Sequence, residues 1–367
     1  MLRNNKYLLI LAILFIININ NSWGQRRKFV NEFLNIGVGA QNLGMFGATT
    51  AKIDDITAAY WNPSGLLNIQ APFQVSAMHS EWFAGIAKYD YLGFGKKLGK
   101  DNSAFGGVTV IRMGVDNIPN TLNLVGADGR INLDEISEFS AADYAFIVSY
   151  AKKFGENIKL GGNTKVIYRQ IGKFANAWGF GFDIGTQIKL GDISVGIMGR
   201  DITSTFTAWS FNMTDEEKMI FALTGNDIPV NSIEYALPKI IGGISYEKGF
   251  GADKKGLTVL AELDINFSTD GSRHSLTSSD FFDLAPALGL EIGLKNKVFF
   301  RAGVGNLQRV LNDVYGDVGS FEVQPNIGLG LKLGRIKIDY ALANAGDVSS
   351  VLYSHIISIS IDLAERN

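Results

Sequence analysis

The chain has 367 residues, with 34 Lys and Arg against 36 Asp and Glu, and it contains no cysteine. The near-neutral charge gives no reason to expect nucleic acid as a partner. The absence of cysteine excludes disulfides, thiolate metal sites, a thiol nucleophile and a lipidated N-terminal cysteine. Glycine is abundant, with 42 residues, and proline is scarce, with 7, so the glycine content does not indicate disorder.

Residues 1–24 are predicted to be a signal peptide. Arg3 and Lys6 form a basic start, residues 8–17 are an unbroken apolar run, and residues 22–24 resemble a small-x-small cleavage site. The apolar run is shorter than the roughly 20 residues that a spanning helix needs. An uncleaved anchor is the alternative interpretation. With a cleaved signal peptide, we expect the mature chain to start near residue 25. No later window has the apolar run of a transmembrane helix.

The rest of the chain shows the period-two pattern of β-strands, most clearly at its end. Between residues 355 and 363, isoleucine and leucine alternate strictly with serine and aspartate, which gives a strand one apolar and one polar face. The same alternation predicts about fourteen strands, near residues 73–79, 88–98, 104–114, 142–154, 157–170, 177–190, 192–206, 239–249, 256–268, 284–295, 297–305, 321–333, 335–344 and 353–364.

The predicted fold is all-β: a transmembrane antiparallel barrel with lipid outside and a polar lumen, over residues 73–367. The strands have the length that a tilted strand needs to cross a bilayer. Short turns alternate with longer connections near 80–87, 115–141, 171–176, 207–238, 269–283, 306–320 and 345–352, which puts both chain ends in the periplasm. A soluble β-sandwich is the alternative, although its strands would be shorter.

Two sets of side chains follow from the barrel prediction. Aromatic residues near strand ends are expected in the interfacial girdles: Tyr89, Tyr91, Trp178, Phe267, Phe299, Phe321 and Tyr353. Charges of both signs are expected to face the lumen, where they hold a plug or each other, or else line a selective pore: Lys159, Lys165, Arg169, Asp183, Lys189, Arg200, Glu262, Asp264, Glu291, Lys295, Arg301, Lys332, Lys337 and Asp339.

Residues 25–72 do not alternate and are rich in small residues. Asp54 and Asp55 precede a short helix expected over residues 56–61, with a carboxylate accepting hydrogen bonds from its first amides. The Asn62–Gly65 sequence then ends this helix with turn-forming residues. Because such a segment cannot lie in lipid, we expect it to form a hatch or plug in the lumen, or to lie beneath the barrel.

Residues 35–69 resemble the PorV/PorQ family of Bacteroidota, which are relatives of the FadL outer-membrane barrels. The resemblance depends on a glycine-rich turn, an Asp-Asp pair and an aromatic-Asn-Pro element. Phe46 and Ser64 depart from the Gly and Ala that are usual in the family. The residues that carry the hatch motif are Gly44, Gly47, Asp54, Asp55, Trp61, Asn62, Pro63 and Gly65.

The resemblance implies a fourteen-stranded barrel with an N-terminal hatch, acting in the type IX secretion system and gliding-motility context. Its expected partners are the SprA-type translocon barrel, secreted cargo with a type IX C-terminal domain, and outer-membrane lipid. Such a protein hands cargo to the cell-surface attachment machinery, and this chain looks like a PorV paralogue. Apolar residues expected in the long outward loops are candidates for partner contact: Phe139, Trp209, Phe211, Met213, Phe221 and Tyr235.

Two other functions are open: a FadL-type transporter for hydrophobic small molecules, and a structural or adhesive surface protein. A transporter needs an apolar pocket under the loops, whereas the inward face of the predicted strands is strongly polar. No catalytic motif is present, and we expect neither an enzyme nor a cofactor. Asp128, Asn132 and Glu135 resemble the second half of a calcium-binding loop, with a helical turn over residues 133–139 as the plainer interpretation.

Overall fold

The computed structural model describes residues 30–99, 102–124, 130–251, 256–269, 277–278, 282–310, 320–343 and 354–364. The predicted signal peptide lies outside these ranges. Within them, no helix has the length and apolar character needed to span a bilayer.

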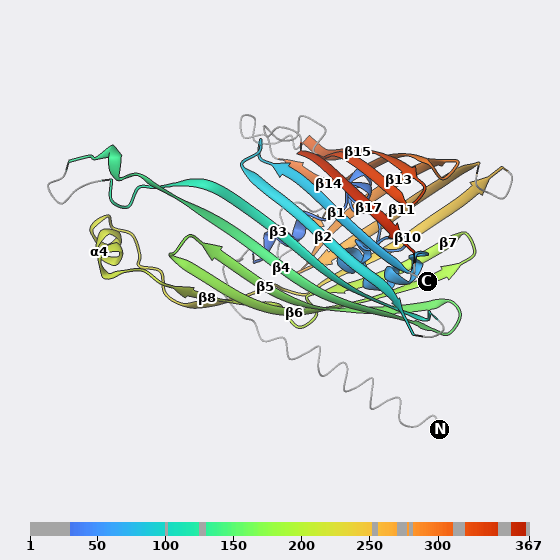
Figure 1. Ribbon diagram of the computed structural model, residues 1–367, viewed down its shortest axis with the longest axis horizontal. Coiled ribbons are helices and arrows are strands. Elements are labelled where there is room, and N and C mark those ends of the chain that lie inside the picture. Colours follow the sequence, from blue (N-terminus) through green and yellow to red (C-terminus); the bar gives the residue numbers. More distant parts are fainter. Residues whose placement is uncertain are drawn as a thin grey trace, which may run out of the picture.

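The chain forms one closed antiparallel barrel, as predicted (Figure 1). Fourteen strands make up the wall, and the first pairs with the last, from Phe73 opposite Leu363 to Glu81 opposite His355. In order around the barrel the wall strands are β1 (Phe73–Trp82), β2 (Ala87–Leu98), β3 (Ala104–Asn120), β4 (Ser137–Phe154), β5 (Ile158–Ile171), β6 (Ala175–Leu190), β7 (Ile193–Arg200), β10 (Lys239–Phe250), β11 (Leu257–Ser268), β13 (Asp283–Leu294), β14 (Val298–Val310), β15 (Ser320–Leu333), β16 (Ile336–Ala343) and β17 (Ser354–Leu363). Three short strands accompany them: β8 (Phe206–Phe211), β9 (Ser232–Tyr235) and β12 (Thr277–Ser278).

Alternation sorts the side chains into an apolar outer face and a polar inner face. On β2, the outward-facing Leu92 and Phe94 are 54% and 43% exposed, whereas Tyr91, on the inner face, is 2% exposed. Charged residues of the inner face, such as Lys165 and Asp183, are buried inside the barrel. This is the pattern of a barrel whose outer face contacts lipid. The predicted inward charges include seven that are buried on the inner face: Lys165, Asp183, Arg200, Glu262, Asp264, Arg301 and Asp339. Lys295 is an exception, because it lies in the turn between β13 and β14.

The two ends of the barrel differ, and we call them the turn end and the loop end. The turn end carries the tight connections between β4 and β5, β6 and β7, and β15 and β16, and the last described residues lie there (Figure 1). At the loop end β3 and β4 extend to 17 and 18 residues, well beyond the roughly 9–11 that a bilayer requires. The predicted long connections near 80–87 and 171–176 are wrong, because the longer strands leave only residues 83–86 and 172–174 between them.

The strand predicted over residues 192–206 is broken. β7 ends at Arg200 and β8 starts at Phe206, and both pair with β6, so residues 201–205 bulge out of the ladder. Asp201 and Ser204 take left-handed backbone conformations, with φ of 55° and 56°. The connection predicted over 207–238 also contains β9 and a helix, α4 (Asp215–Leu223), whose N-terminus is closed by a capping box from Thr214 and Glu217.

The aromatic girdle prediction is correct for some residues and wrong for others. Trp178 and Phe267 are 56% and 37% exposed on the outer face, as expected. Tyr89, Tyr91 and Phe299 are instead buried on the inner face, because they share a strand face with residues that point into the lumen. The side chains of Phe321 and Tyr353 lie outside the described part of the chain.

Residues 30–72, here called the N-terminal segment, lie inside the barrel and hold four short helices: η1 (Glu32–Asn35), α2 (Ala40–Gly44), α3 (Ala58–Trp61) and η2 (Pro63–Asn68) (Figure 1). Their apolar side chains form clusters with the inner wall. The helix expected over 56–61 starts two residues later, because Asp55 accepts hydrogen bonds from Thr57 and makes a turn there. A role of residues 25–72 as a hatch stays a prediction.

Glycines on the inner wall allow the N-terminal segment to approach the strand backbone. A Cβ at Gly303 would stand 2.1 Å from the backbone carbon of Met45, and one at Gly161 would stand 2.4 Å from Pro63. Any side chain at these positions would collide with the main chain of the segment. The high glycine content of the strands is therefore, in part, the space that the segment occupies.

Candidate functional site

Two carboxylates of β11 hold the N-terminal segment by its backbone. Asp264 accepts hydrogen bonds from the N–H groups of Thr49 and Thr50, both at 3.0 Å, through the same oxygen. Glu262 accepts from the next two N–H groups, those of Ala51 at 2.5 Å and Lys52 at 3.3 Å. Four successive backbone N–H groups therefore donate to the two inward-facing acidic side chains Glu262 and Asp264.

Side chains from β5 and β7 hold the second half of the segment. Asn163 on β5 donates to the carbonyl of Ala59 at 2.7 Å. Arg200, at the end of β7, donates to the carbonyl of Tyr60 at 3.1 Å and lies 4.4 Å from the centre of its ring. The segment is thus fixed at several points by polar groups of the wall strands β5, β7 and β11.

A buried ion network stabilises the break between β7 and β8. Lys165 contacts Asp183 at 2.7 Å and Asp201 at 2.5 Å, with the three side chains 3%, 4% and 12% exposed. The backbone N–H of Asp201 donates to Asp183 at 2.9 Å, and the hydroxyl of Thr205 donates to Asp201 at 2.5 Å. Lys165, from β5, therefore neutralises the two buried carboxylates at the bulge of residues 201–205.

A second buried ion group lies across the lumen. Arg301 on β14 donates to Glu291 at 2.6 Å and to Asp339 at 2.7 Å. A Cβ at Gly330 would stand 2.7 Å from its guanidinium, so the glycine makes room for this pairing. Beside it, Asn326 donates to the carbonyl of Leu43 at 2.8 Å.

A cavity of 720 Å³, here called the lumen cavity, lies between the N-terminal segment and the loop-end half of β10–β16. Four aromatic side chains border it, three of them from or beside the helices of the segment. Tyr60 and Trp61 pack edge to face, with ring centres 4.9 Å apart. The volume of the lumen cavity falls within the roughly 300–1,000 Å³ that is usual for small-molecule sites. The aromatic residues are Phe46, Tyr60, Trp61 and Trp82.

The rest of the cavity lining is polar and comes mostly from the wall. Arg200 and Lys239 bring positive charge, and Asp264 and Asn266 bring acceptor oxygens. The side-chain oxygen of Asn266 is buried and has no hydrogen-bond partner among the described residues. A buried acceptor without a partner costs free energy unless a ligand or water donates to it. The arrangement suits a small molecule that is apolar over most of its surface and carries a donor group.

The hatch-motif residues occupy different structural positions. Gly47 leaves space for the ring of Trp61, since its Cβ would stand 2.7 Å from that ring, and Gly44 packs against Gly328. Asn62 caps η2 and donates to the carbonyl of Thr50 at 2.8 Å. Of the predicted set, only Gly47 and Trp61 border the lumen cavity. The others shape the segment or lie elsewhere: Gly44, Asp54, Asp55, Asn62, Pro63 and Gly65.

The two acidic residues of the motif have opposite environments. Burial raises the pKa of Asp55, and it outweighs the opposing effects of Lys337 and of the hydrogen bond from Thr57. Burial would also raise the pKa of Asp54, but Lys52, Lys337 and other cations of the turn end hold it below its ordinary value. Asp54 therefore stays charged and lies exposed at the turn end, whereas Asp55 acts as a structural turn former.

The predicted partner-contact residues are mostly not in loops. Phe139 lies on β4, Trp209 and Phe211 on β8, and Tyr235 on β9. Trp209 is covered by Arg169, 5.0 Å from its ring, and donates to Glu234 at 3.0 Å. Met213 precedes α4 and Phe221 lies on it, and both are half-buried. Of the six, Tyr235 alone is largely exposed, because the strands extend further beyond the membrane than their alternation indicates.

The calcium-like stretch is only partly within the described residues. Asp128 lies outside the described residues, and the side chain of Asn132 accepts from the N–H of Asp134, which closes a 3₁₀ turn over Leu133–Glu135. The helical turn expected over 133–139 is present only over Leu133–Glu135, since β4 already begins at Ser137. No cluster of potential metal ligands occurs among the described residues.

No protein-family model and no curated protein matches the sequence. Solved structures do match. The monoaromatic hydrocarbon channel CymD shares 13% identity over 90% of this chain and 99% of its own, with a TM-score of 0.54. The Pseudomonas putida toluene transporter TodX shares 12% identity over 90% and 99% of the two chains, with a TM-score of 0.55. A Pseudomonas aeruginosa FadL homologue shares 12% over 89% and 98%, with a TM-score of 0.51.

The chain therefore has the fold of FadL-type outer-membrane barrels. Two of these structural neighbours are named as a channel and a transporter, and at 12–13% identity the likeness shows a shared fold. The sequence argument against a transporter considered only the strands, whose inward face is polar. The aromatic border of the lumen cavity comes largely from the N-terminal segment, which has no periodicity from which its inward side could be inferred.

The Lys165 network gives a test of the broken strand. Replacing Lys165 with Met leaves two buried carboxylates facing each other, and breaking a buried ion pair in this way costs about 3–5 kcal/mol. We expect the Lys165→Met variant to unfold at markedly lower urea concentration in detergent, with part of the loss restored in Lys165→Met/Asp183→Asn. Lys248→Met, on an exposed residue of β10, serves as the control. A loss in Lys165→Met no larger than in that control would contradict the described network.

Proposed function

We propose that this protein is an outer-membrane barrel that admits a small amphipathic molecule from its loop end into the lumen cavity. Both chain ends lie in the periplasm in this orientation, as the loop lengths predict. The observation that supports the proposal is the 720 Å³ cavity with aromatic side chains on one side and polar wall residues on the other. The shared fold of toluene and hydrocarbon transport proteins adds support.

The composition of the cavity favours an amphipathic molecule over a pure hydrocarbon. Tyr60 and Trp61 can stack on a ring or chain, and aromatic side chains favour such offset contacts. Arg200 and Asn266 on the polar side offer a charged donor and an unpartnered acceptor. A hydrocarbon would leave the side-chain oxygen of Asn266 without a partner, which lowers its affinity relative to a molecule with one hydroxyl or similar donor group.

The N-terminal segment separates the lumen cavity from the turn end, so passage requires part of it to move. The hydrogen bonds from Thr49–Lys52 to the two carboxylates of β11 hold the closed arrangement. In this proposal the segment is a gate and the cavity is the site where the transported molecule first binds. This gives a function to the hatch that the sequence predicts.

Filling the cavity tests the proposal without removing the segment. Ala285 on the inner face of β13 borders the cavity, and Ala302 on β14 faces outward. We expect Ala285→Trp to weaken the binding of 1-naphthol by about tenfold or more, a loss of ~1.4 kcal/mol, and to slow its uptake into proteoliposomes. Ala302→Trp serves as the size-matched control. Equal binding in both variants and the wild type would contradict the proposal.

A second function, the accessory role in type IX secretion, is favoured by the apolar surface of the loop-end projections. Met219 and Leu223, one turn apart on α4, are 63% and 80% exposed, and Ile131 and Leu133 are both 69% exposed. Exposed apolar residues on such projections often mark a protein-binding surface. The resemblance of residues 35–69 to the PorV/PorQ family names the partners: the SprA-type translocon and cargo C-terminal domains.

A pull-down in mild detergent separates the two functions. If the accessory role is correct, tagged wild-type protein recovers the translocon barrel or cargo, and Met219→Glu/Leu223→Glu loses it because charge replaces the apolar contact. Lys218→Gln on the same helix is the control, since Lys218 pairs only with Asp215 on the surface. Recovery of the barrel alone, in wild type and variants alike, would count against the accessory role.

A further inference from the structure

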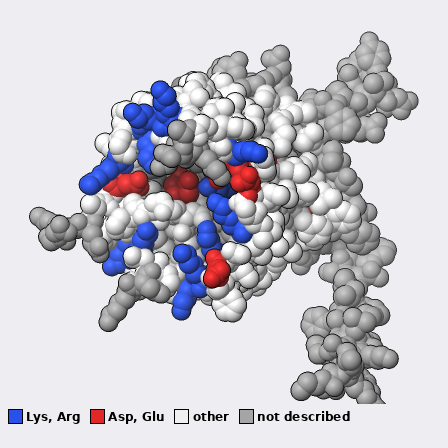
Figure 2. All heavy atoms as spheres, turned by 90° about the vertical axis from the view of Figure 1, so that its right-hand side faces the viewer, with Lys and Arg blue, Asp and Glu red and all other residues white. Residues whose placement is uncertain are grey.

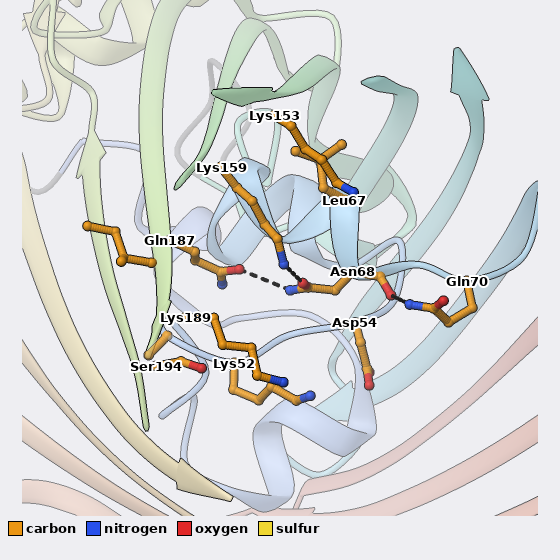
Figure 3. A pocket seen from close by; sticks show the side chains of 12 residues that line it. Lys52, Asp54, Leu67, Asn68, Gln70, Lys153, Lys159, Gln187, Lys189 and Ser194 are labelled. Carbon is orange, nitrogen blue, oxygen red and sulfur yellow. Dashed lines mark hydrogen bonds between the residues drawn. The ribbon is translucent and has the colours of Figure 1, made fainter. Parts of the chain in front are cut away.

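The turn end of the lumen holds a second cavity, of 330 Å³, with an unusual concentration of lysine (Figure 3). Lys153 on β4, Lys159 on β5 and Lys189 on β6 lie on inward-facing positions of three neighbouring strands. Lys52 of the N-terminal segment completes the group. We call this cavity the turn-end pocket. Viewed from the turn end, Lys and Arg side chains gather around the barrel opening with Asp and Glu among them (Figure 2).

The strand register forces like charges together. Lys153 and Lys159 are direct cross-strand partners in the β4–β5 pair, and like charges directly opposite each other destabilise a sheet. Lys159 is opposite Gln187 on β6, so Lys189 is its diagonal neighbour. The charges of Lys52, Lys189 and Lys153 all repel the ammonium of Lys159. The fold therefore bears a repulsion that an anion would remove.

The acidic groups nearby do not neutralise this cluster. Lys52 pairs with Glu247 at 3.0 Å. Burial would lower the pKa of Lys52, but the charges of Asp54 and Glu247 outweigh it and raise the pKa. Asp54 is the only acid among the lining residues of the pocket. Neither Lys153 nor Lys189 has an ion-pair partner among the described residues. When Asp54 and Glu247 are both counted against the four lysines, an excess of two positive charges remains.

The remaining groups of the pocket are neutral hydrogen-bonding side chains. Lys159 donates to the amide oxygen of Asn68, and the amide nitrogen of Asn68 donates to Gln187 at 3.0 Å (Figure 3). Ser194 of β7 lies at the edge of the pocket. Lysines act as hydrated point charges rather than as planar forks, which suits a tetrahedral oxyanion in a wet site better than a carboxylate held in two-point contact.

We propose that the turn-end pocket binds a phosphate-bearing anion with at least two negative charges, held by Lys153, Lys159 and Lys189. The pocket volume is at the low end of the range of small-molecule sites, which limits the bound part to a group of about the size of a diphosphate. Such a group comes either from a soluble oligophosphate or from the headgroup of a phospholipid. The site is separate from the lumen cavity, so its test does not depend on the proposed transport.

Binding is measured on the full chain in an uncharged detergent, by thermal unfolding and calorimetry. Inorganic pyrophosphate is the soluble probe, short-chain phosphatidic acid, whose phosphomonoester can carry two negative charges, is the lipid probe, and chloride at equal ionic strength corrects for general screening. We expect one of the two probes to bind and to raise the unfolding temperature. Lys153→Gln and Lys159→Gln should each weaken this binding about tenfold or more. Lys248→Gln, on the outer face of β10, is the charge-matched control and should bind as the wild type does.

A second readout distinguishes a site from a merely structural cluster. Without any anion, Lys153→Gln should unfold at a higher temperature than the wild type, because it removes the cross-strand repulsion. Binding of pyrophosphate in preference to the lipid identifies a soluble ligand, and the reverse identifies a headgroup. The proposal is overturned if neither probe binds beyond the chloride control, or if both variants bind as tightly as Lys248→Gln.

Discussion

The structure depends on one constraint: the polar inner face of the barrel must find hydrogen-bond partners. Inward-facing carboxylates, amides and guanidinium groups are buried within the wall, where each unpaired group costs free energy. The N-terminal segment supplies the partners through its main chain. Asp264 and Glu262 accept four successive backbone N–H groups, while Asn163 and Arg200 donate to backbone carbonyls. The polar side chains of the wall and the main chain of the segment therefore supply each other's hydrogen-bond partners.

The same constraint explains the glycines and the two cavities. Glycine on the inner wall lets the segment come close enough for its main chain to reach the wall, as at Gly303 and Gly161. Where the segment does not touch the wall, space remains. At the loop end that space is bordered by aromatic side chains, and at the turn end it is bordered by lysines. The two cavities thus have opposite chemical character, because different parts of one segment face them.

Alternation alone predicted the closed barrel, its fourteen wall strands and most of its inward charges. It did not reveal the break at residues 201–205, because that bulge is stabilised by Lys165 from a strand far away in sequence. Tyr89 and Tyr91 were assigned to the interface, although Gly93 and Gly95 on the same face of β2 were a signal that this face meets a close-packed neighbour. The lumen cavity could not be predicted, since its aromatic residues come mainly from a segment without periodicity.

The central claim is that residues near Thr50 lie against the inner face of β10, and an engineered disulfide tests it most directly. A Cβ at Gly243 would stand 3.0 Å from the Cβ of Thr50, close to the ~3.5–4.5 Å of disulfides, and the chain has no cysteine of its own. We expect the Thr50→Cys/Gly243→Cys variant to cross-link on oxidation in the membrane, seen as a mobility shift in a non-reducing gel. Thr50→Cys/Gly242→Cys, whose second cysteine faces outward, should not cross-link. Absence of the cross-link in the first variant, or equal cross-linking in both, would contradict the account.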